Sequence, residues 1–255
     1  MNKLSKNILN FSIGFLFVFS LNIVSQEIEE VVVTATKKAE SVQDLAISIE
    51  AFTADVMDKN LIRDASDLAE VVPGLIMDKG IGSGVSVAIR GTGSYGVGAA
   101  VVGAVVVSSN GHSRGTGGFY DIGFLDVERV EVLKGPQGTL FGRNAVVGAI
   151  NVVTARPTSE YGGKFDITRG SYGQQDVTAV LNLPITDRLS TRFALTSISR
   201  DGLTTNMRDG STFNDRKAQG GRLSVDFDIS DTSVIKFTHD WYNSDDNRNN
   251  IGTII

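Results

Sequence analysis

Ion pairing is the chemistry that the charged residues of one short segment suggest. From Arg129 to Lys134, charged and apolar residues alternate, which predicts a strand with a charged edge. Pro136 follows and ends the strand, because proline lacks a backbone N–H donor and fixes φ. A short helical turn at 139–141 and a second apolar strand at 148–154 come next. The segment therefore predicts two strands joined by a tight turn, with cations placed for ion pairs.

A glycine-rich segment raises the possibility of nucleotide chemistry. Gly91, Gly93 and Gly96 follow a predicted strand and match the dinucleotide-binding spacing G-x-G-x-x-G. That site also requires a helix directly afterwards and an acidic residue about 20 positions later. Residues 97–103 are instead rich in valine and glycine, so a dehydrogenase is disfavoured. Paired catalytic carboxylates, a nucleophile triad and a metal cluster are all missing at sensible spacing, so we expect no enzyme.

The composition excludes several other kinds of site. The 255 residues include no cysteine, which rules out disulfides, thiolate metal sites, cysteine nucleophiles and a lipoprotein anchor. His112 and His239 are the only two histidines, so a histidine-bound metal or haem lacks ligands, and we expect no cofactor. The net charge of -5 argues against a nucleic-acid interface, which needs clustered Lys and Arg.

The N-terminus has the three parts of a secretory signal peptide. Lys3 and Lys6 precede an apolar stretch, residues 8–24, which ends at the small residue Ser25. Polar residues interrupt this stretch, whereas an uncleaved membrane anchor needs about 20 mostly apolar residues. We therefore expect cleavage after Ser25, with Ser20 as the second choice, and an exported mature chain.

Residues 129–144 and their flanks carry a family resemblance. Together with Phe124-Leu125-Asp126-Val127-Glu128 before them and 148–157 after them, they resemble the plug of TonB-dependent outer-membrane receptors. The resemblance implies an α+β plug domain followed by the first strands of an antiparallel transmembrane β-barrel. The expected domains are a signal peptide at 1–25, a TonB-box arm at 26–45, a plug at 46–157 and a partial barrel at 161–255.

The arm contains a segment that suits recognition by another protein. It is rich in β-branched residues and extended, and no strand nearby is expected to pair with it. Strand addition would let backbone hydrogen bonds supply the affinity. The segment resembles the TonB box, which implies the C-terminal domain of TonB in the periplasm as its partner. Its residues are Val31, Val32, Val33, Thr34 and Ala35. The alternative is that they form the first strand of the folded domain.

Local signals predict short elements in the plug region. Thr53 and Asp64 are suited to cap two helices. Val72-Pro73-Gly74 should end the second helix, because the residue before proline avoids helical backbone. The expected elements are strands at 47–52, 85–90 and 101–107 and helices at 54–59 and 65–71.

The resemblance also implies roles for individual side chains. Arg90, Arg129 and Lys134 would face the barrel wall and pair with glutamates on barrel strands, which would hold the plug in place. The alternative is a surface salt bridge with Glu128 or Glu131. Apical loops would face an anionic iron chelate, and the side chains there that could bind it are Tyr95, His112 and Arg114.

Two departures from the family pattern affect these apical loops. Ser108-Ser109-Asn110-Gly111 stands where most relatives have a strand that ends in Asp-Gly, so the turn chemistry is kept but a carboxylate is lost. Val146-Val147-Gly148 stands where relatives usually have Thr-Gly-Gly. Both departures affect the geometry of the apical loops rather than the fold.

From residue 161 onward, segments of period two predict about five strands. Leu223, Val225 and Phe227 point one way while Ser224 and Asp226 point the other, as in a lipid-facing barrel strand. A soluble sandwich has the same alternation and is the alternative. Trp241 and Tyr242 suit an interfacial aromatic girdle. The turns at 184–188 and 230–232 are expected on the periplasmic side, and the polar segment 201–216 outside. Five strands cannot close a bacterial barrel, so the barrel is expected to be incomplete.

The leading functional hypothesis is an active transporter of the Gram-negative outer membrane. Its default cargo is a ferric siderophore complex, while cobalamin, haem and glycans stay open. The second hypothesis is a truncated, transport-incompetent binding module in the periplasm or at the cell surface.

Overall fold

The computed structural model describes residues 32–33, 40–41, 47–79, 85–94, 103–113 and 123–246. Every described residue lies within the unit Val31–Ile255. The expected signal peptide therefore lies outside the described residues, as do Val31, Thr34, Ala35, Tyr95 and Arg114.

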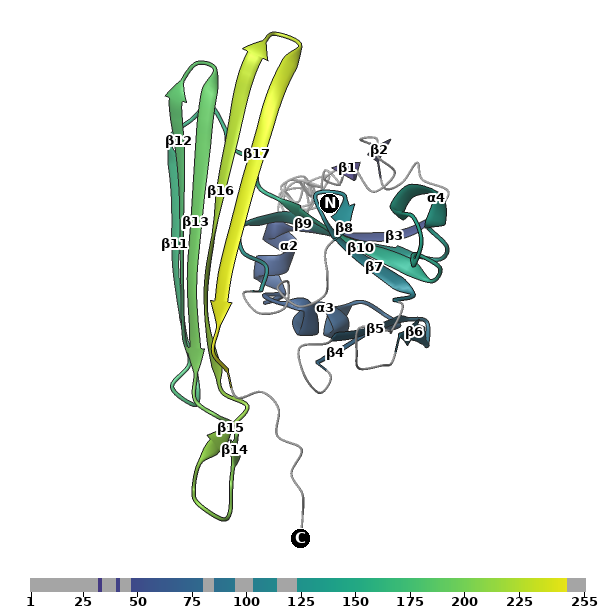
Figure 1. The fold of residues 1–255 in the computed structure, drawn as a ribbon, viewed down its shortest axis with the longest axis vertical. Helices are drawn as coiled ribbons and strands as arrows, with labels where there is room; N and C mark the ends of the chain where they lie inside the picture. Colours follow the sequence, from purple (N-terminus) through teal and green to yellow (C-terminus); the bar gives the residue numbers. More distant parts are fainter. Residues whose placement is uncertain are drawn as a thin grey trace, which may run out of the picture. The chain divides into compact units, whose positions relative to one another are not determined.

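The first part of the described chain, from Ile47 to Pro157, is an α+β globule (Figure 1). Its main sheet has the order β3-β9-β10-β7-β8, and a smaller sheet has the order β4-β5-β6. β10 runs parallel to β7, and the other neighbours are antiparallel. The strands are β3 (Ser48–Thr53), β4 (Leu75–Lys79), β5 (Val85–Ile89), β6 (Thr92–Ser94), β7 (Val105–Ser109), β8 (His112–Ser113), β9 (Val127–Lys134) and β10 (Gly148–Thr154). The helices are α2 (Ala54–Lys59), α3 (Ala65–Val71) and α4 (Gly138–Phe141).

Both predicted helix caps are confirmed. The Thr53 hydroxyl accepts a hydrogen bond from the Val56 N–H at the start of α2. Asp64 accepts from the Ser66 and Asp67 N–H groups at the start of α3, and the Asp67 carboxylate accepts from the Asp64 N–H. This reciprocal capping box satisfies donors that the first helical turn leaves free. Helix α3 ends at Val71, before Pro73, as the sequence predicts.

The core of the globule lies on both faces of β9 and β10. Val130, Val132 and Ile150 pack with α2 and α3 residues on one face, and Leu133 and Ala149 form a second cluster. β9 lies between β3 and β10, and its charged residues Arg129, Glu131 and Lys134 are buried, whereas Glu128 is exposed. The predicted charged edge is therefore wrong, because a central strand has no free edge.

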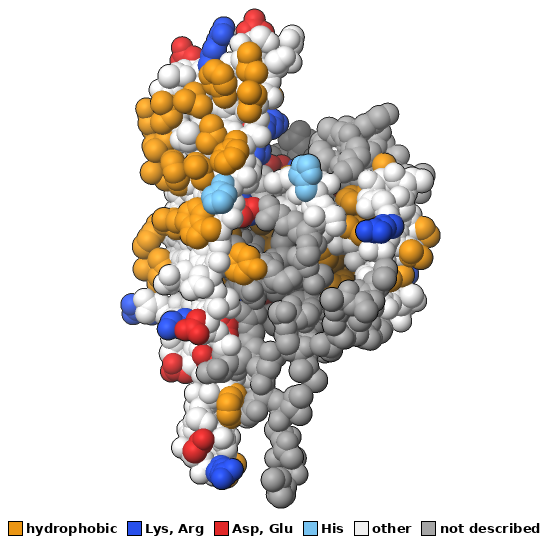
Figure 2. Space-filling view, in the orientation of Figure 1, with side chains coloured by type: hydrophobic (Ala, Val, Ile, Leu, Met, Phe, Trp, Pro, Cys, Tyr) orange, Lys and Arg blue, Asp and Glu red, His pale blue; other side chains and the backbone are white. Residues whose placement is uncertain are grey.

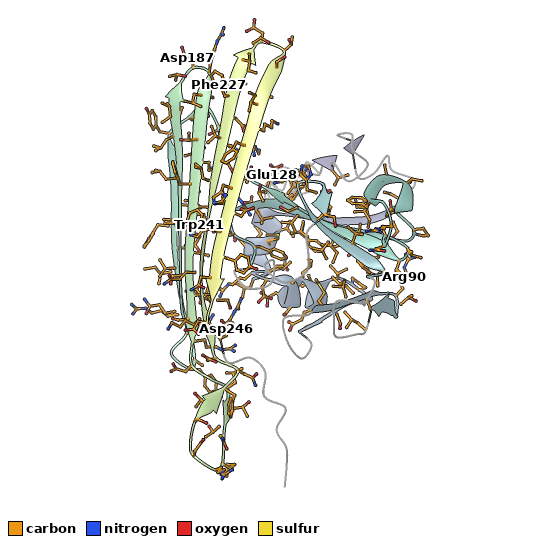
Figure 3. The ribbon with its side chains drawn as sticks, in the orientation of Figure 1. Arg90, Glu128, Asp187, Phe227, Trp241 and Asp246 are labelled. Atoms are coloured by element: carbon orange, nitrogen blue, oxygen red, sulfur yellow. The ribbon has the colours of Figure 1, made fainter. Side chains whose placement is uncertain are left out.

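The second part of the described chain is an antiparallel sheet of five long strands, here called the strand sheet. Its order is β11-β12-β13-β16-β17, which confirms five strands and the fold class of a globule followed by an open antiparallel sheet. The short turn that contains Asp187 and the residue Asp246 lie at opposite ends of the sheet (Figure 3). The strands are β11 (Gly162–Arg169), β12 (Gln175–Thr186), β13 (Leu189–Arg200), β16 (Arg216–Ser230) and β17 (Ser233–Ser244). The long connection between β13 and β16 holds a small hairpin of β14 (Thr204–Thr205) and β15 (Thr212–Phe213).

The strand sheet has one apolar face and one polar face. Phe165, Leu195 and Phe237 are each at least half exposed, and Figure 2 shows hydrophobic side chains gathered on the strands. Alternate residues on the opposite face, such as Asn182, Arg222 and Ser224, are buried. The predicted alternation is thus present. Trp241 shares the apolar face, but Tyr242 does not, because adjacent residues of a strand face opposite sides. Among the described residues, no helix combines the length and the apolar character that a membrane crossing needs.

Part of the arm forms a ladder of its own. β1 (Val32–Val33) pairs antiparallel with β2 (Glu40–Ser41), so the expectation that no partner lies nearby is wrong for these two residues. Val33 is fully buried. This ladder is separate from the main sheet of the globule, whose first strand is β3.

Candidate functional site

The globule contacts the strand sheet through residues 123–126, here called the corner. The Leu125 side chain is 4% exposed and packs against Val180 of β12 and Ala194 of β13. The Asp126 carboxylate accepts two hydrogen bonds from Arg192 of β13, Nε to Oδ2 at 2.7 Å and Nη2 to Oδ1 at 2.7 Å. A bidentate Arg–carboxylate pair fixes orientation as well as distance. The corner is therefore docked on the polar face of the strand sheet in one defined geometry.

Two further arginines of β16 extend this contact. Arg222 donates from Nη1 to the Leu125 carbonyl oxygen at 2.7 Å and from Nε to Asp240 Oδ1 at 2.6 Å. Arg216 Nη1 lies 3.3 Å from Asp64 Oδ2, so the same carboxylate caps helix α3 and pairs with the sheet. Oxygen atoms of the globule thus accept hydrogen bonds or ion pairs from arginines of the strand sheet.

The segment that links the globule to β11 is also bound to the sheet. Arg156 forms an ion pair with Asp226 and donates from Nη1 to Thr238 Oγ1 at 2.8 Å. Burial lowers the pKa of Arg156 because desolvation disfavours the charged form. The contacts with Asp226 and Thr238 compensate for part of this lost hydration.

Two of the predicted cations, Arg90 and Lys134, lie near the start of β3. Lys134 Nζ donates to Glu50 Oε1 at 2.5 Å and to the Pro73 carbonyl oxygen at 2.9 Å. Arg90 Nη2 donates to Ser48 Oγ at 3.3 Å, and Figure 3 shows Arg90 at the β5–β6 turn. These partners belong to the globule itself. Pairing of these cations with glutamates of a barrel wall stays a prediction.

The third predicted cation, Arg129, starts a buried polar network. It pairs with Glu128 and donates from Nε to Glu131 Oε1 at 2.8 Å. Glu131 Oε2 accepts from Asn151 Nδ2 at 2.8 Å. Asn151 Oδ1 in turn accepts from Ser108 Oγ at 2.9 Å and from the Gly111 N–H at 3.1 Å. The network therefore runs across β9, β10 and β7 to the turn that precedes His112. Both predicted salt bridges of Arg129 exist, and the one with Glu131 is buried, whereas the Glu128 side chain is 49% exposed.

Of the three predicted ligand-binding residues, the structure describes only His112, which is exposed in β8. The turn before it explains one departure from the family pattern. Asn110 Nδ2 donates to Thr154 Oγ1 at 3.0 Å, and Asn110 Oδ1 accepts from the Thr154 N–H at 3.0 Å. An aspartate could not donate the first of these bonds. Within the described ranges, no three His, Asp or Glu side chains gather as metal ligands.

Sequence reasoning missed the arginines that dock the globule. Arg192, Arg216 and Arg222 all fall at even positions, on the polar face that the alternation predicts. A long cation on the inner face of a strand requires an acceptor opposite it. That signal was present, but it does not identify Asp126 or Asp64 as the acceptor.

Comparison with known proteins gives the globule a family. Residues 41–149 match the family model described as TonB-dependent Receptor Plug Domain. The chain is 26% identical over 215 residues to the iron-regulated outer membrane virulence protein of Vibrio cholerae, covering 79% of this chain and 33% of that protein. It is 31% identical over 150 residues to the vitamin B12 transporter BtuB of Vibrio vulnificus, covering 58% of this chain and 24% of that protein.

Solved structures give the same fold. The ferric yersiniabactin uptake receptor FyuA from Yersinia pestis superposes with a TM-score of 0.69 at 24% identity, covering 77% of this chain and 31% of that structure. The chain thus spans about a third or less of the length of these proteins.

Proposed function

Because the chain belongs to the TonB-dependent receptor family, with a plug domain followed by barrel strands, we propose that it takes part in active transport across the outer membrane. The observation that carries this proposal is the docking of Leu125 and Asp126 on the polar face of a sheet whose other face is apolar. A barrel strand needs an apolar face toward lipid and a polar face toward the lumen. A globule held on the polar face would block that lumen.

The proposed energy input enters through residues Val31 to Ala35. An extended segment can add as a strand to the periplasmic domain of TonB, and a pull on it would rearrange the plug. Val32 and Val33 pair with β2 through only two residues each, so this ladder must open first. Each backbone hydrogen bond contributes roughly 0.5–1.5 kcal/mol, so a TonB strand that pairs with the arm over more residues can displace this short ladder.

The proposed cargo is a ferric siderophore complex. Relatives are named for ferric enterobactin and for vitamin B12, and a solved relative for ferric yersiniabactin. Metal chelates are the class that these names share, and cobalamin is the alternative. Tyr95, His112 and Arg114 are the proposed contacts, because an anionic chelate needs hydrogen-bond donors and positive charge around it.

The proposed domains and location follow from the same family. A signal peptide at 1–25 would export the chain, an arm at 26–45 would carry the TonB box, a plug would span 46–157, and barrel strands would occupy 161–255. Pairing of Arg90, Arg129 and Lys134 with glutamates of further strands stays part of the proposal.

The test separates location from transport. Outer membranes from cells that express the intact gene are fractionated, and heat-modifiable migration of the protein supports a barrel. Uptake of iron-55 supplied as ferric enterobactin or ferric yersiniabactin is then measured with and without a proton uncoupler. Uncoupler-sensitive uptake supports the transporter. A soluble monomer that binds but does not transport supports the periplasmic binding module instead.

A further inference from the structure

We propose that Lys134 is a positioning residue that keeps β3, the first strand of the plug, in its sheet until the arm is pulled. Its contacts with Glu50 and the Pro73 carbonyl are here called the β3 latch. The inference rests on the proposed function, because it concerns the resistance that a pull on the arm must overcome. In this proposal the functional partner of Lys134 is Glu50, inside the plug, in addition to any pairing with a barrel wall.

The position of β3 makes it the first element that tension reaches. The arm joins the globule at Ser48, where β3 begins, and Ser48 is paired with Lys134 in the ladder between β3 and β9. In the described part of the chain, β9 is the only neighbour of β3 in the main sheet. A pull that enters at Ser48 therefore acts first on the pair that contains Lys134.

The latch joins three elements through one ammonium group. The Lys134 side chain is 7% exposed, and its Nζ connects β9 to Glu50 of β3 and to Pro73, in the connection between α3 and β4. Arg90 links the same elements. Its backbone N–H donates to the Gly74 carbonyl oxygen at 2.7 Å, and its side chain donates to Ser48 Oγ at the start of β3. Release of β3 separates Glu50 from the ammonium, so the ion pair must be broken before the strand can leave.

The start of β9 and its edge toward β10 are held in place by other contacts. β9 starts at Val127, directly after Asp126, whose carboxylate is bound by Arg192 and whose carbonyl oxygen accepts from the Ala155 N–H at 3.0 Å. β9 also shares its full length with β10. Tension on the arm therefore separates β3 from β9 rather than β9 from the strand sheet. Because Thr53 caps α2, complete release of β3 also removes the cap of that helix.

Unequal burial of the two charges gives a specific test. Glu50 is 35% exposed and Lys134 only 7%, so Glu50→Gln leaves a buried charge unpaired, whereas Lys134→Met leaves a carboxylate that water can reach. Glu50→Gln should therefore weaken β3 more than Lys134→Met. The double variant Glu50→Gln/Lys134→Met removes both charges and should recover most of the loss. Lys164→Met, which removes an exposed pair with Asp58, is the matched control.

The measurement is amide hydrogen exchange of the intact chain in outer-membrane vesicles, with the arm free. We expect Glu50→Gln to speed exchange in β3 roughly 100-fold while β10 changes little. The double variant should return β3 to within roughly tenfold of the unmodified protein. Unchanged β3 exchange, or equal acceleration in β3 and β10, overturns the latch.

A second readout separates this role from a merely structural one. Single molecules are pulled through a handle at residue 31, and the force of the first rupture is recorded. The latch predicts a lower first rupture force for Glu50→Gln, a recovered force for the double variant and no change for Lys164→Met. An unchanged force in Glu50→Gln contradicts it. Uptake is measured separately, so a protein that transports nothing but shows these shifts contradicts only the proposed function.

Discussion

At the scale of single residues, the Trp241 ring lies directly over Gly221 on the apolar face. They are directly opposite in the β16–β17 ladder, and a Cβ added at Gly221 would lie 2.1 Å from the indole ring. Glycine is required there because the ring lies across the strand. Trp241 also stacks on His239, with ring centroids 6.4 Å apart.

This contact gives a fluorescence prediction, because Trp241 is the only tryptophan in the chain. Gly221→Ala should displace the indole and shift its emission maximum. Gly162→Ala is the control, since a Cβ at Gly162 meets nothing within 4 Å. Equal emission spectra for Gly221→Ala and the unmodified protein would show that the ring does not occupy this position.

A second residue-scale prediction concerns Asp209 in the connection between β14 and β15. Its pKa lies below the ordinary value of 3.8 because the Ser211 hydroxyl and N–H both donate to Oδ1, at 2.6 and 2.9 Å. A lowered carboxyl pKa stabilises the folded loop above the unfolded pKa, and that contribution is lost as pH falls through the folded pKa. Ser211→Ala should therefore raise the pKa of Asp209 toward 3.8, as followed by carboxyl NMR shifts. An unchanged titration curve would exclude a contribution from the Ser211 hydroxyl.

At the scale of elements, the cap of α3 can be separated from its ion pair. Asp64 caps the helix with Oδ1 and faces Arg216 with Oδ2. Asp64→Ser keeps a capping oxygen and loses the pair, whereas Asp64→Ala loses both. Loss of a cap costs about 1 kcal/mol, or roughly fivefold in the opening equilibrium. Amide exchange in α3 should therefore be about fivefold faster in Asp64→Ala than in Asp64→Ser. Identical rates would mean that the cap contributes nothing.

The docking of the corner on β13 makes a second prediction at this scale. Asp126 is 8% exposed in its side chain, so Arg192→Met leaves a buried carboxylate without its bidentate partner. Breaking such a pair costs about 3–5 kcal/mol. Limited proteolysis of the segment between β10 and β11 should become faster in Arg192→Met. The double variant Asp126→Asn/Arg192→Met should restore much of the protection, and failure to do so would assign the effect to packing rather than charge.

At the scale of the whole molecule, elements with local causes were predictable and contacts between distant residues were not. Thr53 and Asp64 cap helices that begin beside them, so both helices are at the predicted residues. The period-two pattern likewise predicts the five long strands. In contrast, Lys134 and Glu50 are 84 residues apart, and Asp126 and Arg192 are 66 apart. No local pattern specifies such pairs, because they depend on which strands become neighbours.

Burial of β9 was missed for the same reason. Its alternating charges resemble those of an exposed strand, and only its pairing with β3 and β10 encloses Arg129, Glu131 and Lys134. The family resemblance implies that Arg129 and Lys134 pair with a barrel wall, which stays a prediction, and the acceptors that the structure shows for both lie in the globule.

We propose that force applied at Val31 to Ala35 moves a plug within a barrel. The most direct measurement compares Val33→Pro with Val33→Ala in cells that express the intact gene. Proline removes a backbone donor and opposes strand addition, whereas alanine keeps the backbone. Val33→Pro should bind ferric siderophore at the cell surface as the unmodified protein does but lose uncoupler-sensitive uptake, while Val33→Ala keeps most of it. Full uptake by Val33→Pro would contradict the claim.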